Sequence, residues 1–265
     1  MLASSVAPVA SPLMINFRDA ATHIPGLKPG KLFRTSVCFT PGPEITAIVD
    51  LRRRGAQLER WHVPENRPQS VVKRYHVPFV GSQAGLALLY GLPFAKKIEL
   101  MCCLRENSNV EMVVGSHYFQ SPREITQMYL TMTELGSGEL FQIFQIFEQE
   151  TNGQGAVAVH CVAGKDRTGI VVALLARLCD AEVAHIALDY SLSQANLLAT
   201  SSAELGNDPF LADYKDGMLT SSPALAMERF LLELEHTYGS VRRFLVQKVG
   251  LKEQVLDSIV SRLKA

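Results

Sequence analysis

The sequence predicts a single α/β domain in which a central, mostly parallel sheet is flanked by helices. Short apolar runs typical of buried strands lie mainly in the first half of the chain, and helical periodicity dominates the second half. A strand–loop–helix unit over residues 156–179 joins the two patterns, and no Gly/Ser-rich linker divides the 265 residues. Hydrophobic residues make up 47% of the chain and charged residues 20%, which fits a globular protein with a large core.

Composition excludes several classes of protein. Residues 1–14 hold Ser, Ala and Pro but no Lys or Arg, so we expect a flexible N-terminal tail rather than a signal peptide, followed by one domain over residues 15–265. Basic and acidic residues balance at 26 each, which gives no global basis for binding nucleic acid. The apolar window 86–104 contains three charged residues and is a poor membrane span. Five cysteines form no disulfide pattern, so we expect a cytoplasmic location.

Apolar runs bounded by turn residues predict the strands. They cover residues 31–35, 45–51, 75–80 and 156–160. Pro78 places the third of these at the edge or the end of the sheet, because proline cannot donate to a central ladder. The second run ends in the polar cluster that begins at Asp50, so its carboxyl end delivers charged groups to one edge of the sheet.

Helical spacing of apolar residues predicts the helices. The first helical stretch runs from Ser121 to Glu150, with Ser121-Pro122 as its N-terminal cap. Further helices are predicted over residues 168–179, 183–198, 223–238 and 252–263. Gly239 and Gly250 stand where helix C-caps are expected. The helix over 168–179 is apolar on nearly all sides and should lie buried at the centre of the domain.

The stretch between the last predicted strand and this buried helix carries the most chemical information. It reads His-Cys-Val-Ala-Gly-Lys-Asp-Arg-Thr-Gly over residues 160–169. Backbone N–H groups at a helix N-terminus can surround an oxyanion. The residues expected to do so are Val162, Ala163, Gly164, Lys165, Asp166 and Arg167. Cys161 would attack as a thiolate, and the planar fork of Arg167 would bind two equatorial oxygens. The loop therefore predicts a site that attacks a bound phosphate.

The remaining loop residues have supporting roles in this interpretation. Gly164 permits the tight curvature, and Gly169 lets the helix start close to the strand. Thr168 is placed to donate its hydroxyl to the thiolate. His160 either stabilises the thiolate through hydrogen bonds or is simply a packed core histidine. Lys165 adds a cation, which gives a weak indication of a second phosphate on the substrate.

Other sites are weaker interpretations of the same residues. A nucleotide-binding P-loop needs glycine at Val159 and Ser or Thr at Asp166, so it is excluded. A chance turn beside an unreactive core cysteine would not explain Cys, Gly and Arg together between a strand and a helix. No Cys-x-x-Cys pair or Cys/His cluster suggests zinc, and we expect neither a metal nor a cofactor.

The loop resembles that of the cysteine-dependent protein tyrosine phosphatases, and Lys165-Asp166 makes it most similar to the atypical tyrosine/lipid phosphatase branch. Other segments match that branch as well: 16–19, 30–36, 48–52, 238–241 and 262–263. The resemblance runs from Asn16 to the end of the chain, except over residues 86–120. It implies a tyrosine-phosphatase-like domain that hydrolyses phosphotyrosine, often phosphoserine or phosphothreonine, and phosphoinositides, through a phosphocysteine intermediate and without a metal. It also suggests that Arg18 and Asp19 brace the loop.

The general acid stays open at this point. Many tyrosine phosphatases use an aspartate on a separate loop, yet no aspartate lies between Asp50 and Asp166. Asp166 is the favoured acid, and a structural brace is its alternative role. Asp50 ranks second as the acid, because we expect it to pair with Arg52 or Arg53 at the end of the strand instead. Glu124 is a further candidate.

Residues 86–120 are predicted to be an insertion or a lid. The segment 86–104 is either a packed core helix, which is slightly favoured, or an amphipathic lid that makes transient contact with a membrane surface. The expected partner is a phosphorylated protein or a phosphoinositide. Two other functions remain as alternatives: a catalytically inactive phosphate-binding adaptor, which usually lacks the Cys or the Arg, and a sulfur-transfer enzyme.

Overall fold

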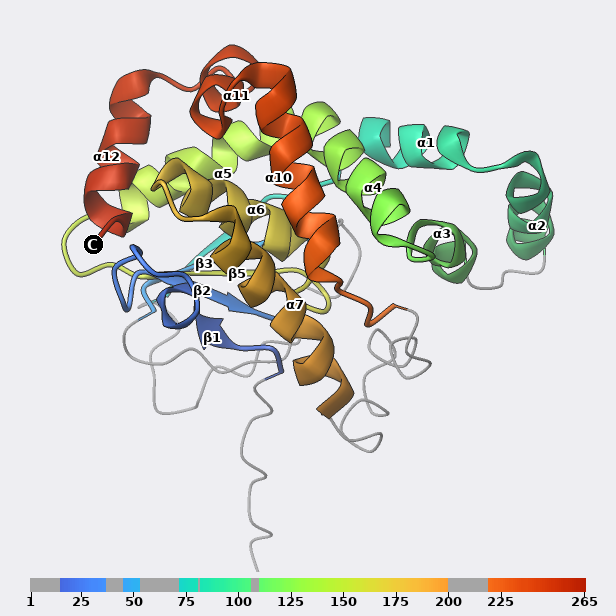
Figure 1. The fold of residues 1–265 in the computed structure, drawn as a ribbon, viewed down its shortest axis with the longest axis horizontal. Coiled ribbons are helices and arrows are strands. Elements are labelled where there is room, and N and C mark those ends of the chain that lie inside the picture. Colours follow the sequence, from blue (N-terminus) through green and yellow to red (C-terminus); the bar gives the residue numbers. More distant parts are fainter. Residues whose placement is uncertain (1–14, 37–44, 53–71, 81, 106–109, 200–218) are drawn as a thin grey trace, which may run out of the picture.

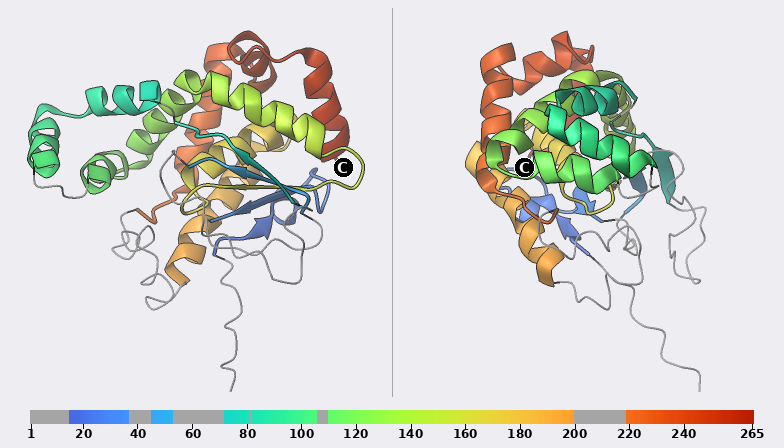
Figure 2. Two further views of the ribbon diagram at one scale, coloured as in Figure 1. Left: turned by 180° about the vertical axis from the view of Figure 1, so that it is seen from behind. Right: turned by 90° about the vertical axis from the view of Figure 1, so that its right-hand side faces the viewer.

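The computed structural model describes residues 15–36, 45–52, 72–80, 82–105, 110–199 and 219–265. Helices pack over one face of a central sheet, and α1, α2 and α3 project from one side of this body (Figure 1). The same arrangement is seen from behind and from the side in Figure 2. The tail predicted over residues 1–14 lies outside the described residues.

Within the described residues, five strands form one sheet in the order β1-β2-β5-β3-β4. Their bounds are β1 Arg18–Asp19, β2 Leu32–Thr35, β3 Ala47–Asp50, β4 Lys73–His76 and β5 Val157–His160. β1 pairs with β2 in the antiparallel direction, and the other three pairings are parallel. The prediction of a mostly parallel sheet is therefore confirmed. Because β5 lies at the centre, the chain that follows it leaves the sheet between the carboxyl ends of β2 and β3.

The strands divide the core into two apolar clusters. Val157 and Val159 of β5 face the large cluster shared with the helices, whereas Ala158 joins a smaller cluster with Phe33 and Ile48. This alternation is the period-two pattern of a strand that is buried on both faces. Burial on both sides fixes the register of β5, and so fixes where the residue after His160 emerges.

The helices of the described residues are α1 Ser82–Gly91, α2 Phe94–Arg105, α3 Val110–Tyr118, α4 Pro122–Leu135, α5 Ser137–Glu150, α6 Asp166–Leu178, α7 Val183–Ala199, α10 Ala224–Tyr238, α11 Val241–Gln247 and α12 Glu253–Leu263. Of these, α4, α7 and α11 pack against α6, the buried helix that follows β5. Ten residues of α6, from Thr168 to Leu178, are buried, which confirms a central position for this helix. Gly239 ends α10 with a φ of 83°, as a left-handed C-cap requires.

Two predicted elements differ from the structure. The helical stretch over residues 121–150 is two helices, with the break at Gly136. A Cβ at Gly136 would lie 2.5 Å from the Phe79 ring, so a tertiary contact selects glycine and the chain turns there. The strand predicted over 75–80 occupies Lys73–His76 instead and forms the edge of the sheet, with Pro78 beyond its end. The short β1, the single-turn helix Ala20–Thr22 and α11 were not predicted.

The favoured interpretation of 86–104 as one packed core helix differs from the structure. The segment covers residues 86–91 of α1 and most of α2, and α1 packs against α4. Leu88, Leu92 and Leu100 are buried. Tyr90 and Phe94 are each 78% exposed, so α1 and α2 carry large apolar side chains on their surface. Among the described residues, no helix combines the length and hydropathy needed to span a membrane.

Candidate active site

Cys161 begins a loop that connects the central strand to the buried helix. It follows β5 directly, and α6 begins at Asp166, so the loop spans residues 161–165. The thiol residue is only 3% exposed and therefore lies at the bottom of the loop. Register places Thr35 of β2 and Asp50 of β3 on either side of His160. The strand ends thus surround the start of the loop, as the sequence predicted for the carboxyl edge of a parallel sheet.

Gly164 makes the curvature of the loop sterically possible. Its φ is +65°, and a Cβ at this position would lie 2.2 Å from the carbonyl oxygen of Thr35. Both facts require glycine. Gly169 has a different neighbour from the one expected. The nearest atom to a Cβ there is on the Tyr190 ring of α7, at 3.0 Å, so this glycine brings α6 close to α7 rather than to the strand.

Arg167 and Thr168 lie in the first turn of α6. Arg167 donates from Nη1 to the carbonyl oxygen of Leu51 at 3.2 Å, which ties the guanidinium to the end of β3. Its Nε and Nη2 have no partner among the described residues. The hydroxyl of Thr168 is buried and also finds no hydrogen-bond partner in the described part of the chain. Donors that are buried or held in this way can bind a substrate oxygen or a thiolate without breaking a protein contact.

His160 lies in a buried polar cluster with Asp50 and Arg52. Its Nδ1 is 3.0 Å from the carbonyl oxygen of Cys161, and its Nε2 is 3.4 Å from Asp50 Oδ1. Burial lowers the pKa of His160 to about 4, so the ring is neutral at pH 7. Its position fits the expected support of the thiolate and its complete burial fits the packed alternative; both interpretations stay open.

Asp50 forms the ion pair that the sequence predicted. Arg52 Nη2 lies 2.8 Å from Asp50 Oδ2, and its Nε and backbone N–H lie 3.0 Å from Oδ1. Burial acts to raise the pKa of Asp50, but the hydrogen bonds from Arg52 and the charges around it hold the pKa below its usual value. The alternative partner, Arg53, lies outside the described residues.

Asp166 is held by a tyrosine from another helix. Tyr129 of α4 donates to Asp166 Oδ1 at 2.5 Å, and Tyr190 of α7 lies 2.7 Å from the same tyrosine hydroxyl. Burial raises the pKa of Tyr129 well above its usual value, so the phenol keeps its proton. No described residue bonds to Oδ2 of Asp166. Among the described residues, the carboxylate is therefore oriented through Oδ1 alone.

Lys165 has a different setting from the one expected. Its side chain is completely buried rather than open to the substrate side. The ammonium donates to the carbonyl oxygen of Ser221 at 2.7 Å, lies 3.3 Å from Asp166 Oδ1 and sits 4.1 Å above the Phe119 ring. Desolvation lowers the pKa of Lys165. The side chain links the loop to the residues after α3 and before α10.

The N-terminal segment braces the loop through residues that sequence reasoning partly missed. Asn16 donates to the carbonyl oxygens of Ala163 and Gly164, at 2.9 and 3.0 Å. Arg18 bonds to Asn16 in turn, as the resemblance suggested. Asp19 was expected to help but accepts from Ala21 and Gly30 instead, so that expectation is wrong.

Three further residues of the site were not singled out. They are Arg34, Tyr129 and Asp189. Arg34 lies within the segment 30–36 that carries the resemblance, so the sequence held a signal for it. Tyr129 lies far along the chain from its partner Asp166, and Asp189 lies far along the chain from Arg18 and Arg34, so no local pattern distinguishes these two residues. Glu124, a candidate acid, lies in the first turn of α4 and accepts from the hydroxyl of the N-cap residue Ser121, which lowers its pKa.

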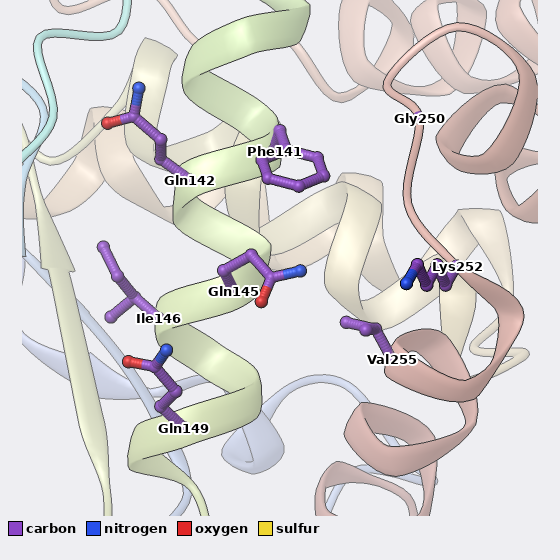
Figure 3. A pocket seen from close by; sticks show the side chains of 8 residues that line it. All are labelled: Phe141, Gln142, Gln145, Ile146, Gln149, Gly250, Lys252 and Val255. Carbon is purple, nitrogen blue, oxygen red and sulfur yellow. The ribbon is translucent and has the colours of Figure 1, made fainter.

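A separate groove lies between α5 and α12. It has a volume of about 750 Å³ and is lined by Phe141, Gln142, Gln145, Ile146, Gln149, Gly250, Lys252 and Val255 (Figure 3). None of these residues belongs to the cysteine loop, and α5 ends on the side where β5 begins. We therefore assign the chemistry to the loop and not to this groove. Among the described residues, no group of three or more His, Cys, Asp or Glu side chains could hold a metal ion.

Comparison with known proteins agrees with this geometry. The sequence profile described as "Tyrosine phosphatase family" matches residues 12–265. A protein from Nostoc commune named tyrosine-protein phosphatase is 28% identical over 154 residues, which cover 54% of this chain. The chain spans about half the length of that relative, 50% of which is aligned. The profile covers nearly the whole sequence and includes the cysteine loop. The chain belongs to the tyrosine phosphatase family.

Proposed function

We propose that the protein hydrolyses phosphotyrosine and related phosphomonoesters through a phosphocysteine intermediate on Cys161, without a metal. Membership in the tyrosine phosphatase family supports a phosphatase activity. The observation that carries the finer proposal is the loop itself. A buried thiol lies at the bottom of a loop whose curvature requires Gly164, and Arg167 lies in the first turn of the helix that follows the loop.

In the first step, the Cys161 thiolate attacks phosphorus and forms the P–S bond. The bond to the leaving oxygen breaks, and its electron pair stays on that oxygen, which takes a proton from the general acid. Backbone N–H groups of the loop and the free guanidinium donors of Arg167 bind the three equatorial oxygens. These contacts are strongest in the trigonal bipyramidal transition state, where charge on those oxygens is greatest. Thr168 donates its unpartnered hydroxyl to the thiolate.

In the second step, water attacks phosphorus and the P–S bond breaks, which returns the thiolate of Cys161. The general acid, now a carboxylate, accepts the proton that the water loses. Inorganic phosphate leaves the loop. No oxidant, metal or cofactor enters this balance, because each step is a displacement at phosphorus coupled to one proton transfer.

Asp166 is the proposed general acid. Its Oδ2 has no partner among the described residues, while Oδ1 is held by Tyr129. The other candidates are less suited to donating a proton at neutral pH. Asp50 is ion-paired with Arg52 and its pKa is lowered, and Glu124 is bonded to the Ser121 hydroxyl in the first turn of α4 and has a lowered pKa. The segment 78–81 offers no carboxylate, and its Phe79 is buried against Gly136.

The proposed physiological substrates are phosphoproteins, with phosphoserine, phosphothreonine and phosphoinositides as further substrates of the same loop. The arm formed by α1 and α2 supports a transient contact with an anionic membrane surface. Tyr90, Phe94 and Met101 are exposed on it, and Lys96 and Lys97 lie beside them. Apolar side chains flanked by lysines favour the boundary of anionic lipid headgroups.

The test compares wild type with Cys161→Ser on p-nitrophenyl phosphate in the presence of EDTA. Wild type should turn over, and the variant should lose activity by roughly 10⁴-fold or more because an alcohol cannot replace the thiolate at neutral pH. A wild type that binds phosphate without turnover would indicate the inactive adaptor instead. Turnover retained by Cys161→Ser would exclude the phosphocysteine mechanism.

A further inference from the structure

A group of buried polar side chains lies directly behind the cysteine loop. We call Asn16, Arg18, Arg34, Asp189 and Ser193 the arginine support. Their exposed fractions range from 8% for Arg18 to 0% for Asp189. They come from β1, β2, α7 and the residues before β1, so the loop rests on three separate parts of the fold. Burial of two guanidinium groups is costly, and a structural core alone does not require it.

The arginine support holds the carbonyl groups of the loop. Asn16 donates to the carbonyl oxygens of Ala163 and Gly164. Arg34 Nη2 donates to the carbonyl oxygen of Gly164 at 2.9 Å and lies 3.4 Å from that of Lys165. Three successive carbonyl groups are thus drawn toward the support.

The directions of these carbonyl groups determine the directions of the backbone N–H groups that follow them. In a planar trans peptide, the carbonyl group of one residue and the N–H group of the next point in opposite directions. The described residues contain no cis peptide bond. The N–H groups of Gly164, Lys165 and Asp166 therefore point away from the arginine support. This is the arrangement that an oxyanion on the opposite side of the loop requires.

The arginine support also carries a net positive charge. Arg18 Nε lies 2.7 Å from Asp189 Oδ1, and Arg34 Nη1 lies 2.5 Å from Asp189 Oδ2. A single carboxylate thus serves two guanidinium groups, with the Ser193 hydroxyl 3.2 Å from Nη2 of each. Burial and the charge of Arg34 lower the pKa of Arg18 to about 10, so Arg18 stays charged at pH 7. Arg34 Nε finds no hydrogen-bond partner among the described residues.

We propose that Arg34, together with Arg18, is a positioning residue that holds the N–H groups of the loop toward the substrate and supplies an uncompensated positive charge beneath the bound phosphate. This inference rests on the proposed function of the loop as a phosphate site. In this proposal, the Asp189 carboxylate orients both arginines and offsets one of their two positive charges. The remaining positive charge attracts the phosphate dianion that binds on the other side of the loop.

The test is tungstate binding, measured by calorimetry on wild type, Arg34→Met, Arg34→Lys and Asp189→Asn, with thermal unfolding recorded for each. Arg34→Met should weaken binding by about 10- to 100-fold, as expected for loss of charge-assisted hydrogen bonds. Arg34→Lys should recover part of that loss, since it restores the charge without the fork. Asp189→Asn removes the offsetting charge, so it should bind tungstate at least as tightly as wild type although it is less stable. Arg242→Met, at a surface ion pair with Glu253, is the control and should bind normally.

A purely structural role would give a different pattern. In that case Asp189→Asn would weaken binding as much as Arg34→Met, and Arg34→Lys would recover nothing; either result overturns the proposal. If Arg34→Met does not fold, Arg34→Lys and Ser193→Ala decide, with a loss of roughly 2- to 10-fold expected for each. Tungstate binding needs no turnover. A wild type that binds tungstate but cleaves no phosphomonoester would refute the proposed hydrolysis. The tungstate affinities of the variants would still decide whether the arginine support positions the loop.

Discussion

At the scale of single residues, the chemistry depends on how neighbouring side chains hold the reacting groups. Asp166 shows this most clearly, because a buried phenol fixes its Oδ1 while no described residue binds its Oδ2. The contact with Tyr129 therefore sets the orientation of the proposed acid.

Tyr129→Phe tests this link. The variant removes the donor that orients Asp166, so kcat should fall by about 3- to 10-fold because the acid is less well placed. Asp166→Asn should fall in kcat by about 10²- to 10⁴-fold and lose the basic limb of the kcat profile. The measurement is kcat against pH with p-nitrophenyl phosphate. Tyr190→Phe is the matched control because its hydroxyl contacts Tyr129, so its kcat should fall less. A kcat and a basic limb that stay at wild-type values in Asp166→Asn would exclude Asp166 as the acid.

Gly164 and Gly153 offer a matched pair for the steric argument. Their φ angles are +65° and +62°, but a Cβ at Gly153 meets open space, whereas one at Gly164 meets the backbone of Thr35. Gly153→Ala should cost about 1–2 kcal/mol of unfolding free energy, from the left-handed backbone alone. Gly164→Ala should cost about 2–4 kcal/mol and reduce kcat/KM by at least about 100-fold, because the loop must move. Urea unfolding and steady-state kinetics check both; equal effects on the two variants would contradict the account.

At the scale of secondary-structure elements, the arm stands out from the body. Helix α1 packs against α4, and α2 packs against α3, which in turn contacts α4. Large apolar side chains are exposed on α1 and α2. The chain returns from the arm to the body through α3, and Phe119, just after α3, lies under the Lys165 ammonium. The arm is thus connected to the loop through α3 and Phe119.

The membrane contact is tested with the double variant Tyr90→Ser/Phe94→Ser. Wild type should sediment with vesicles that contain phosphatidylserine and a phosphoinositide, and the double variant should not, because it lacks the most exposed apolar side chains of the arm. Turnover of p-nitrophenyl phosphate should be equal in both. Leu188→Ser changes an exposed leucine on α7 and is the control. Failure of wild type to sediment, or equal sedimentation of the double variant, would remove the membrane from the proposal.

At the scale of the whole molecule, buried ionisable groups near the loop couple stability to pH. Burial lowers the pKa of His160 to about 4 in the folded state, whereas the ordinary pKa of a histidine is 6.5. Between these values the unfolded chain binds more protons, so stability falls as pH decreases through this window. Asp189 has a lowered pKa because both arginines outweigh the effect of burial, and its contribution is lost only at still lower pH.

Urea unfolding at pH 7 and pH 5 measures this effect. The wild type should be about 2 kcal/mol less stable at pH 5 from His160 alone. His160→Asn should be less stable at pH 7 but should show a much smaller difference between the two pH values. His185→Asn, on the exposed surface of α7, should behave like wild type. If His160→Asn keeps the full pH dependence, another group is responsible.

The sequence predicted the parts of this molecule that are local in the chain. The strand, loop and helix around Cys161 are contiguous, so composition and spacing were enough to place them. The break at Gly136 was missed because its cause is a contact with Phe79 on another element. The bracing of the loop by Asn16 was missed for the same reason, since 147 residues separate the donor from the carbonyl it binds. Long-range contacts of this kind have no period in the sequence.

The central claim is that phosphate is transferred to Cys161, and the most direct measurement is the mass of the acid-quenched enzyme. Wild type and Cys161→Ser would be mixed with p-nitrophenyl phosphate, quenched within milliseconds and digested for mass spectrometry. The account predicts one added phosphoryl group on the peptide that contains Cys161 in wild type and none in the variant. Steady turnover with no phosphoryl group on Cys161, or with the group on another residue, would contradict it.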